Sequence, residues 1–297
     1  MHNDGALRAD FWLLLVTVLA AFGWVFSSMA LDGMAPLLFM AGRFLMAGLV
    51  LTLAGWRSLK ALSRQSWRYS LVTGAVMGLA MAFWINGLAR ADNMGIGAFL
   101  TSLGVVFVPI VGRLFFGAST STSTWLAVAV ALLGLALLRL EGGFALSLSD
   151  AFFLGAALVF SLHFNLNSRL ARHIPALPLT TIQLLVTGAL CLLLSLLVEP
   201  RPLWPKASIL AWLLASALIA TCLRFWLQIK AQGLANVSHA AVIMTLEPVW
   251  TALFGLIWFA QYLSLLQLLG CLLIFSALLI SRWRLLLRRP RPTEIAS

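Results

Sequence analysis

Charged and titratable side chains within long apolar segments are the residues of this sequence whose chemistry stands out. Arg43, Arg224 and Glu247 each interrupt a stretch that is otherwise almost wholly apolar. A charge at the centre of a bilayer costs about 2.5–3.5 kcal/mol on insertion scales, so each of these residues needs a partner or a function. If both arginines face the interior, two cations against one carboxylate favour a solute that carries a carboxylate or another anion.

The two arginines have different structural alternatives to solute binding. Arg43 lies midway along its segment and either contacts the solute or bonds to Glu247 or to helix-end carbonyl groups. Arg224 shares a helix face with Thr221 and Gln228, at spacings of three and four residues. It also lies toward one end of its segment, so its long side chain can instead reach the lipid headgroups.

Two further groups are candidates for carrying a proton. Glu247 precedes Pro248, which removes a backbone donor and predicts a local break in the helix. His163 can titrate near physiological pH or hydrogen-bond a solute. Each has a structural alternative, because Glu247 can pair with Arg43 or with freed backbone donors, and His163 can form a helix-to-helix hydrogen bond.

Other polar and aromatic side chains at similar depth complete the predicted site. Hydroxyl groups in such helices often bond to a carbonyl of their own helix, so a threonine alone is weak support for a site. Tryptophan can serve as an apolar wall. The predicted substrate-binding residues are Trp24, Arg43, Asn86, Thr101, His163, Gln183, Trp226 and Glu247.

Composition identifies the elements that carry these residues as membrane spans. The chain has 297 residues, of which 62% are hydrophobic and only 10% are charged. A soluble domain is closer to half apolar and a quarter charged. Apolar stretches of about 17–25 residues, long enough to cross a bilayer, predict an all-α integral membrane protein with ten transmembrane helices. The predicted spans are 11–31, 35–54, 71–89, 94–116, 124–139, 150–168, 179–198, 209–231, 237–259 and 264–281.

The distribution of Lys and Arg predicts the orientation of these spans. Most basic residues fall in the segments on one side, including the 57–68 loop and the 282–291 tail. The positive-inside rule therefore places both termini in the cytoplasm of a multi-pass protein of the cell membrane, the inner membrane if the cell is Gram-negative.

The two halves of the sequence resemble each other. Gly48 matches Gly188 and Asn93 matches Asn236, at an offset of about 140 residues. We expect residues 1–140 to form a first five-helix repeat and residues 141–297 a second one with a basic cytoplasmic tail. Because each repeat has an odd number of spans, the second crosses the membrane in the opposite sense. Two inverted repeats are typical of secondary transporters that work by alternating access.

Three groups of segments resemble one family. They are GRFLMAGLVL in the second span, GIGAFLTSLGVVFVP and SHAAVIMTLEPVW in the fourth and ninth, and DAFFLGAALVFSLHF at the start of the second repeat. Together with the length and the duplication, they resemble the EamA-type ten-helix permeases of the drug/metabolite transporter superfamily. The resemblance implies export of amino acids or other small metabolites, with protons as a candidate coupling ion.

Other functional classes find little support in the sequence. It holds no HExxH motif, no paired intramembrane aspartates and no Ser, His and Asp set, so we expect neither an enzyme nor a catalytic residue. The scattered basic residues do not indicate nucleic-acid binding, and the three cysteines indicate neither a metal nor a disulfide. We expect no cofactor, and lipid and a small solute as partners. The alternatives kept open are a broad-specificity multidrug efflux transporter and, more remotely, a non-transporting membrane sensor or assembly partner.

Overall fold

A computed structural model describes residues 2–117, 122–139, 146–200, 205–234, 243–244 and 246–286. Over these residues the protein is all-helical, without a strand. The start of the predicted ninth span, with Asn236, and the basic tail from residue 287 onward lie outside the described residues. In chain order the helices are α1 (His2–Leu31), α2 (Pro36–Lys60), α3 (Arg64–Leu88), α4 (Met94–Ser102), α5 (Gly104–Phe116), α6 (Thr122–Arg139), α7 (Leu148–Leu170), α8 (Ala176–Val198), α9 (Ala207–Ala217), the π-helix η1 (Leu218–Leu223), α10 (Arg224–Leu234), α12 (Glu247–Phe259) and α13 (Leu265–Leu286).

Within the part of the chain that the structure describes, seven helical segments are long and apolar enough to cross a membrane. The fourth combines α4 and α5, and the seventh combines α9, η1 and α10. Three shorter apolar helices, Trp125–Gly134, Glu247–Phe259 and Leu265–Ala277, fall within the three remaining predicted spans. The prediction of an all-helical protein with multiple membrane spans is therefore confirmed.

Large apolar side chains cover the outside of the bundle. Leu53 is 84% exposed, and Leu196 and Leu265 are each 73% exposed. Such a surface would associate in water, whereas lipid tails are as apolar as leucine itself. The outside of the bundle is thus built to face hydrocarbon, and its polar groups are turned inward.

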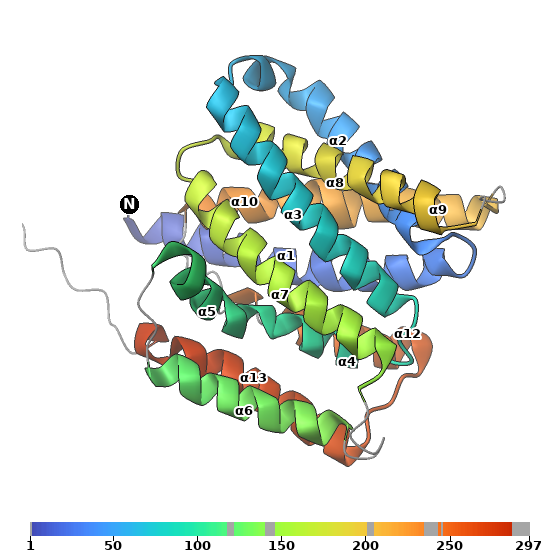
Figure 1. Ribbon diagram of the computed structural model, residues 1–297, viewed down its shortest axis with the longest axis vertical. Helices are drawn as coiled ribbons and strands as arrows, with labels where there is room; N and C mark the ends of the chain where they lie inside the picture. The colour runs from blue at the N-terminus through green and yellow to red at the C-terminus, as the bar shows by residue number, and fades with distance from the viewer. Residues whose placement is uncertain are drawn as a thin grey trace, which may run out of the picture.

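A pair of glycines brings α2 and α8 close together, and these helices lie against each other in Figure 1. A Cβ atom on Gly48 would lie 3.1 Å from the backbone nitrogen of Leu185, and one on Gly188 would lie 2.7 Å from that of Leu45. Each glycine therefore meets the residue three positions before the other glycine. Small residues allow this approach, which replaces side-chain contacts with closer backbone packing.

Side chains from other elements cap several helix starts. Ala35 provides no side-chain cap for α2, and the Glu199 carboxylate instead accepts hydrogen bonds from the backbone N–H groups of Leu37 (2.6 Å) and Leu38 (3.0 Å). At the start of α4, Gln261 accepts a bond from the Met94 N–H at 3.0 Å. These bonds satisfy backbone donors that a helix start leaves unpaired.

Helices α6 and α13 pair along one side of the bundle (Figure 1). A Cβ on Gly134 of α6 would lie 2.8 Å from the carbonyl oxygen of Gly270 in α13, so this pair also meets at small residues. The pair touches the remaining helices through α4 and α5. The other helices enclose the interior, with α1 packed on α10 and α12, and α7 packed on α3, α4 and α5.

Candidate functional site

A cavity of about 190 Å³ lies between α1, α2, α3, α4, α5, α7, η1, α10 and α12. One part of its wall is aromatic and sulfur-containing, and the other part is polar. The apolar part includes Trp24, Met77, Met81, Trp84, Phe160 and Phe164. The polar part includes Arg43, Thr101, His163, Arg224, Gln228 and Glu247.

Arg43 enters this cavity from the first third of α2 and is only 4% exposed. Its Nε donates to the Thr221 hydroxyl, one terminal nitrogen donates to Ser27 Oγ at 3.0 Å, and the other donates to the Ala220 carbonyl at 3.2 Å. Thr221 and Ala220 belong to η1, where the π-helical turn departs from the regular ladder. The guanidinium group thus joins α2 to α1 and η1 through three neutral acceptors. One of these bonds goes to a backbone carbonyl, the kind of partner that the sequence left open as an alternative to solute binding, and the other two go to hydroxyl groups.

Glu247 is the only acid among the described residues that line the cavity, and it has two side-chain partners. The Trp24 indole Nε1 donates to Oε1 at 3.1 Å, and an Arg224 terminal nitrogen lies 3.4 Å from Oε2. The side chains of Arg224 and Glu247 are 13% and 23% exposed, so the pair borders the open space. The position of Glu247 follows from Pro248, because α12 begins at Glu247 after a turn at Leu246. The acid therefore pairs with Arg224 and not with Arg43.

His163 lines the cavity from α7 and belongs to a chain of hydrogen bonds. Its Nε2 lies 3.0 Å from Gln183 Oε1, and Gln183 Nε2 donates to Asn167 Oδ1 at 2.9 Å. An amide oxygen only accepts hydrogen bonds, so the proton of the neutral imidazole is on Nε2. Nδ1 is then an acceptor, held by a ring that Gln183 orients. Gln183 itself is buried and lies behind His163, outside the cavity wall.

The remaining predicted residues occupy three different environments. Thr101 lines the cavity, but its hydroxyl donates to the Gly97 carbonyl at 2.9 Å. Asn86 lies outside the cavity wall and accepts a bond from Arg90 at 2.9 Å. Trp226 also lies outside it, with its ring 6.4 Å from that of Trp12. The structure thus brings Trp24, Arg43, Thr101, His163 and Glu247 to the cavity wall and leaves Asn86, Gln183 and Trp226 away from it.

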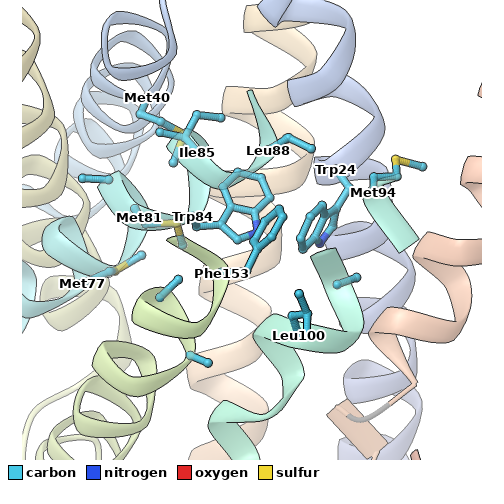
Figure 2. Close-up of a cluster of buried hydrophobic side chains, with 14 of the residues drawn as sticks. Trp24, Met40, Met77, Met81, Trp84, Ile85, Leu88, Met94, Leu100 and Phe153 are labelled. Carbon is cyan, nitrogen blue, oxygen red and sulfur yellow. The ribbon is translucent and has the colours of Figure 1, made fainter. Parts of the chain in front are cut away.

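An aromatic cluster closes one end of the cavity. The ring centroid of Trp24 lies 4.7 Å from that of Trp84 and 5.7 Å from that of Phe153. Figure 2 shows these three rings together, with Leu88, Met94 and Leu100 around them. We name Trp24, Trp84 and Phe153 the aromatic plug.

A second hollow of about 400 Å³ lies beyond the aromatic plug. Its wall is polar and includes Arg90, Asp92, Asn93, Gln261 and Tyr262, from the α3–α4 and α12–α13 connections. Phe153 lines this hollow, whereas Trp24 and Trp84 line the central cavity. The plug therefore separates two spaces that together run along the bundle.

Comparison with known proteins identifies the family. The model of the EamA-like transporter family matches residues 7–140 and again residues 147–283. The chain belongs to the EamA-like transporter family. An uncharacterized transporter of Archaeoglobus fulgidus is 28% identical to this transporter over 278 residues, which are 92% of this chain and 85% of that protein. A solved crystal structure superimposes with a TM-score of 0.67 at 19% identity, covering 96% of this chain and 99% of the other, and so shares the fold.

Family membership confirms the resemblance inferred from the sequence. The protein is a multi-pass membrane transporter, which implies a small-molecule solute and a lipid environment. The central cavity is the place in this transporter where charged, polar and aromatic side chains surround an open space.

Four polar residues that line this transporter's cavity are absent from the predicted set, namely Ser102, Ser161, Arg224 and Gln228. The two serines donate to carbonyl groups of their own helices. The signal for Arg224 and Gln228 was their shared helix face with Thr221, which the structure places toward the interior. Depth along the helix pointed instead to the headgroups. The ion pair with Glu247 and the ring of Phe225, 4.6 Å from the guanidinium carbon, hold Arg224 inside the bundle.

Proposed function

We propose that this transporter exports small organic metabolites that carry a carboxylate, such as amino acids or their relatives, by alternating access. The observation that carries the proposal is the charge of the central cavity. Arg43 and Arg224 face it together with a single carboxylate, Glu247. Among the described residues one of these two positive charges has no acidic partner, because Arg43 bonds only to neutral acceptors, and burial of a charge without a counter-charge is costly. A monoanionic carboxylate group supplies that partner.

Arg224 is better placed than Arg43 to bind the solute. All three nitrogens of Arg43 already donate to acceptors on α1 and η1. Among the described residues Arg224 makes one hydrogen bond, at 3.4 Å, to Glu247. A solute carboxylate can therefore bind Arg224 without breaking the bonds that join α1, α2 and η1, and Arg43 contributes its charge to the cavity.

The topology that we propose is ten spans in two inverted five-helix repeats, residues 1–140 and 141–297, with both termini in the cytoplasm. The two matches to the family lie one in each half. The reciprocal contact of Gly48 and Gly188 supports the same proposal, because a two-fold axis between α2 and α8 would exchange these residues. The distribution of Lys and Arg supports the orientation in the cell membrane.

Alternating access requires that the two ends of the pathway open in turn. In this state the aromatic plug separates the cavity from the hollow near Arg90, while residues such as Gln228 and Met244 extend the cavity toward the end where α1 begins. We propose that the plug is the closed outer gate. Glu247 is the candidate proton carrier, since its protonation would weaken its ion pair with Arg224 and its bond to Trp24.

The experiment is a binding assay on the purified full chain, followed by flux measurements in proteoliposomes. We expect carboxylates to raise the Tm of the wild type and of Arg224→Lys, and to bind Arg224→Gln about 10- to 100-fold more weakly, the range for a hydrogen bond to a charged group. Arg113→Gln is the matched control, because Arg113 is an exposed arginine at the end of α5. Equal loss of binding in Arg113→Gln and Arg224→Gln would contradict the proposal.

One observation favours multidrug efflux as a second candidate. The apolar wall contains Trp24, Trp84 and two methionines, and such surfaces accept varied amphipathic cations. If this candidate is right, tetraphenylphosphonium raises the Tm of the wild type and of Arg224→Gln but not that of Glu247→Gln. That pattern, without any effect of carboxylates, would replace the metabolite proposal.

A further inference from the structure

Two atoms of the cavity wall lack a hydrogen-bond partner among the described residues. They are Nε of Arg224 and Oε1 of Gln228, and both are fully buried. Native proteins leave few buried polar atoms unpaired, and each such atom carries an unfavourable desolvation free energy. The other charged or hydroxyl groups of the same wall are satisfied, since Arg43 has three acceptors and Thr101 bonds within its helix.

The two unpaired atoms are neighbours on one helix and have opposite roles. Arg224 and Gln228 are four residues apart on α10, a spacing at which side chains lie about 5–6 Å from each other at Cβ. The Arg224 Nε–H is a donor, and the Gln228 carbonyl oxygen is an acceptor. A carboxylate alone satisfies the first and leaves the second unpaired. A solute with a donor on the carbon next to its carboxylate satisfies both.

The opposite wall offers acceptors for the same donor group. His163 lines the cavity from α7, and its bond to Gln183 leaves Nδ1 as an acceptor. A donor group on the solute can therefore bond to His163 Nδ1 on α7 and to Gln228 Oε1 on α10. A solute without a donor leaves both of these acceptors unpaired.

We propose that Arg224 and Gln228 form a donor–acceptor subsite, in which Gln228 selects solutes with an ammonium group beside the carboxylate over solutes that lack it. This inference rests on the proposed function and narrows it, because it assigns the discrimination between amino acids and simple carboxylates to one side chain. Arg224 binds the carboxylate, and Gln228 accepts a hydrogen bond from the neighbouring ammonium group.

Isothermal titration calorimetry of the purified full chain tests this proposal with three probes that share a side chain. Phenylalanine carries the ammonium group, 3-phenyllactate carries a hydroxyl group in its place, and 3-phenylpropionate carries neither. We expect the wild type to bind phenylalanine at least about 10-fold more tightly than 3-phenylpropionate, with 3-phenyllactate between them, because an unmatched buried acceptor is costly. Equal affinity of the wild type for all three probes would overturn the inference.

Two substitutions at one position separate recognition from folding. Gln228→Leu removes the acceptor, so we expect phenylalanine to bind about as weakly as 3-phenylpropionate, whose own affinity stays unchanged. Gln228→Asn keeps an uncharged carbonyl acceptor on a shorter side chain, so we expect part of the preference for phenylalanine to remain. The ligand-free Tm of Gln228→Leu stays at or above the wild-type value, since no bond among the described residues is lost. A parallel weakening of both probes by Gln228→Leu would show that Gln228 has only a structural role.

The same titrations distinguish failure of this inference from failure of the proposed function. If the probes bind with affinities that depend on Arg224 but not on Gln228, the selectivity proposal is wrong and the carboxylate proposal stands. If none of the three binds, both proposals are wrong.

Discussion

Replacement of Gly188 by alanine tests the close approach of α8 to α2. The new methyl carbon would lie 2.7 Å from both the backbone nitrogen and Cγ of Leu45. Non-bonded heavy atoms attract best at about 3.5–4.0 Å, so the helices have to separate locally by about 0.8 Å. Overpacking of this kind costs about 1–3 kcal/mol. A clash with backbone lies at the upper end of that range, since no rotamer change relieves it.

The net effect is smaller because alanine favours a helix more than glycine does. That preference is worth about 1 kcal/mol, which leaves Gly188→Ala destabilised by about 2 kcal/mol. Gly48→Ala should cost less. Its nearest neighbours are Cδ2 and Cγ of Leu185, at 2.7 and 2.8 Å, and that side chain can move, while the backbone nitrogen is 3.1 Å away.

Thermal unfolding of the detergent-purified full chain measures these differences. We expect Gly188→Ala to lower the Tm by about 4–8 °C and Gly48→Ala by less, at about 2–4 °C per kcal/mol. Gly155→Ala is the matched control in α7, where the nearest atom is a Phe83 ring carbon at 3.4 Å, an ordinary contact. We expect its Tm to be unchanged or slightly raised.

A rescue experiment sharpens the same test. Leu185→Ala should restore the Tm of Gly48→Ala, because it removes the side-chain clash, whereas Leu45→Ala should not restore that of Gly188→Ala. If Gly188→Ala and Gly155→Ala melt at the same temperature, α2 and α8 do not approach each other as described and the reasoning is refuted.

Three further predictions follow from single contacts. Glu199→Gln weakens the cap on the first turn of α2 and should lower the free energy of unfolding by about 0.5–2 kcal/mol, measured by the shift in thermal unfolding; an unchanged Tm would mean that the cap contributes nothing. Trp24→Phe keeps an aromatic ring but removes the hydrogen-bond donor to Glu247, so the pH dependence of transport in proteoliposomes should change while the fold remains. An unaltered pH profile would mean that the hydrogen bond from Trp24 does not affect the function of Glu247. Phe153→Ala removes one ring of the aromatic plug. In an Ala98→Cys background it should speed the labelling of that cysteine by a membrane-impermeant thiol reagent added on the outer side. Equal labelling rates with and without Phe153→Ala would show that Phe153 is not part of the gate.

Hydropathy predicted the membrane segments because the bilayer sets a minimum length for an apolar helix. It could not predict interruptions within a segment. The predicted fourth span, 94–116, divides at Leu103 between α4 and α5, and the predicted eighth span, 209–231, contains the π-helix η1. Both are changes of hydrogen-bond register within segments that stay mostly apolar, so the pattern of apolar residues does not record them.

The candidate site was harder to predict, because depth along a helix does not fix which face turns inward. In a membrane bundle the outward face is as apolar as the packed one. Trp226 illustrates this limit. It lies two residues from both Arg224 and Gln228, so it points away from the cavity once those two point into it. Helix geometry therefore shows that Trp226 cannot line the same cavity as Arg224 and Gln228. The contact of Trp24 with Glu247, in contrast, depends on the packing of α1 against α12, which cannot be predicted from the spacing of residues in the sequence.

The π-helix η1 also bears on how the two halves diverged. Bonds from i to i+5 accommodate one residue more than an α-helical turn. The sequence pair Phe83 and Phe225 is two residues farther apart than the pair Gly48 and Gly188, and η1 ends two residues before Phe225. A π-helical bulge accommodates one such extra residue without shifting the rest of the helix. The carbonyl of Ala220 in that bulge accepts a hydrogen bond from Arg43, so the segment that accommodates an extra residue in the second half also provides an acceptor for a buried cation of the first half.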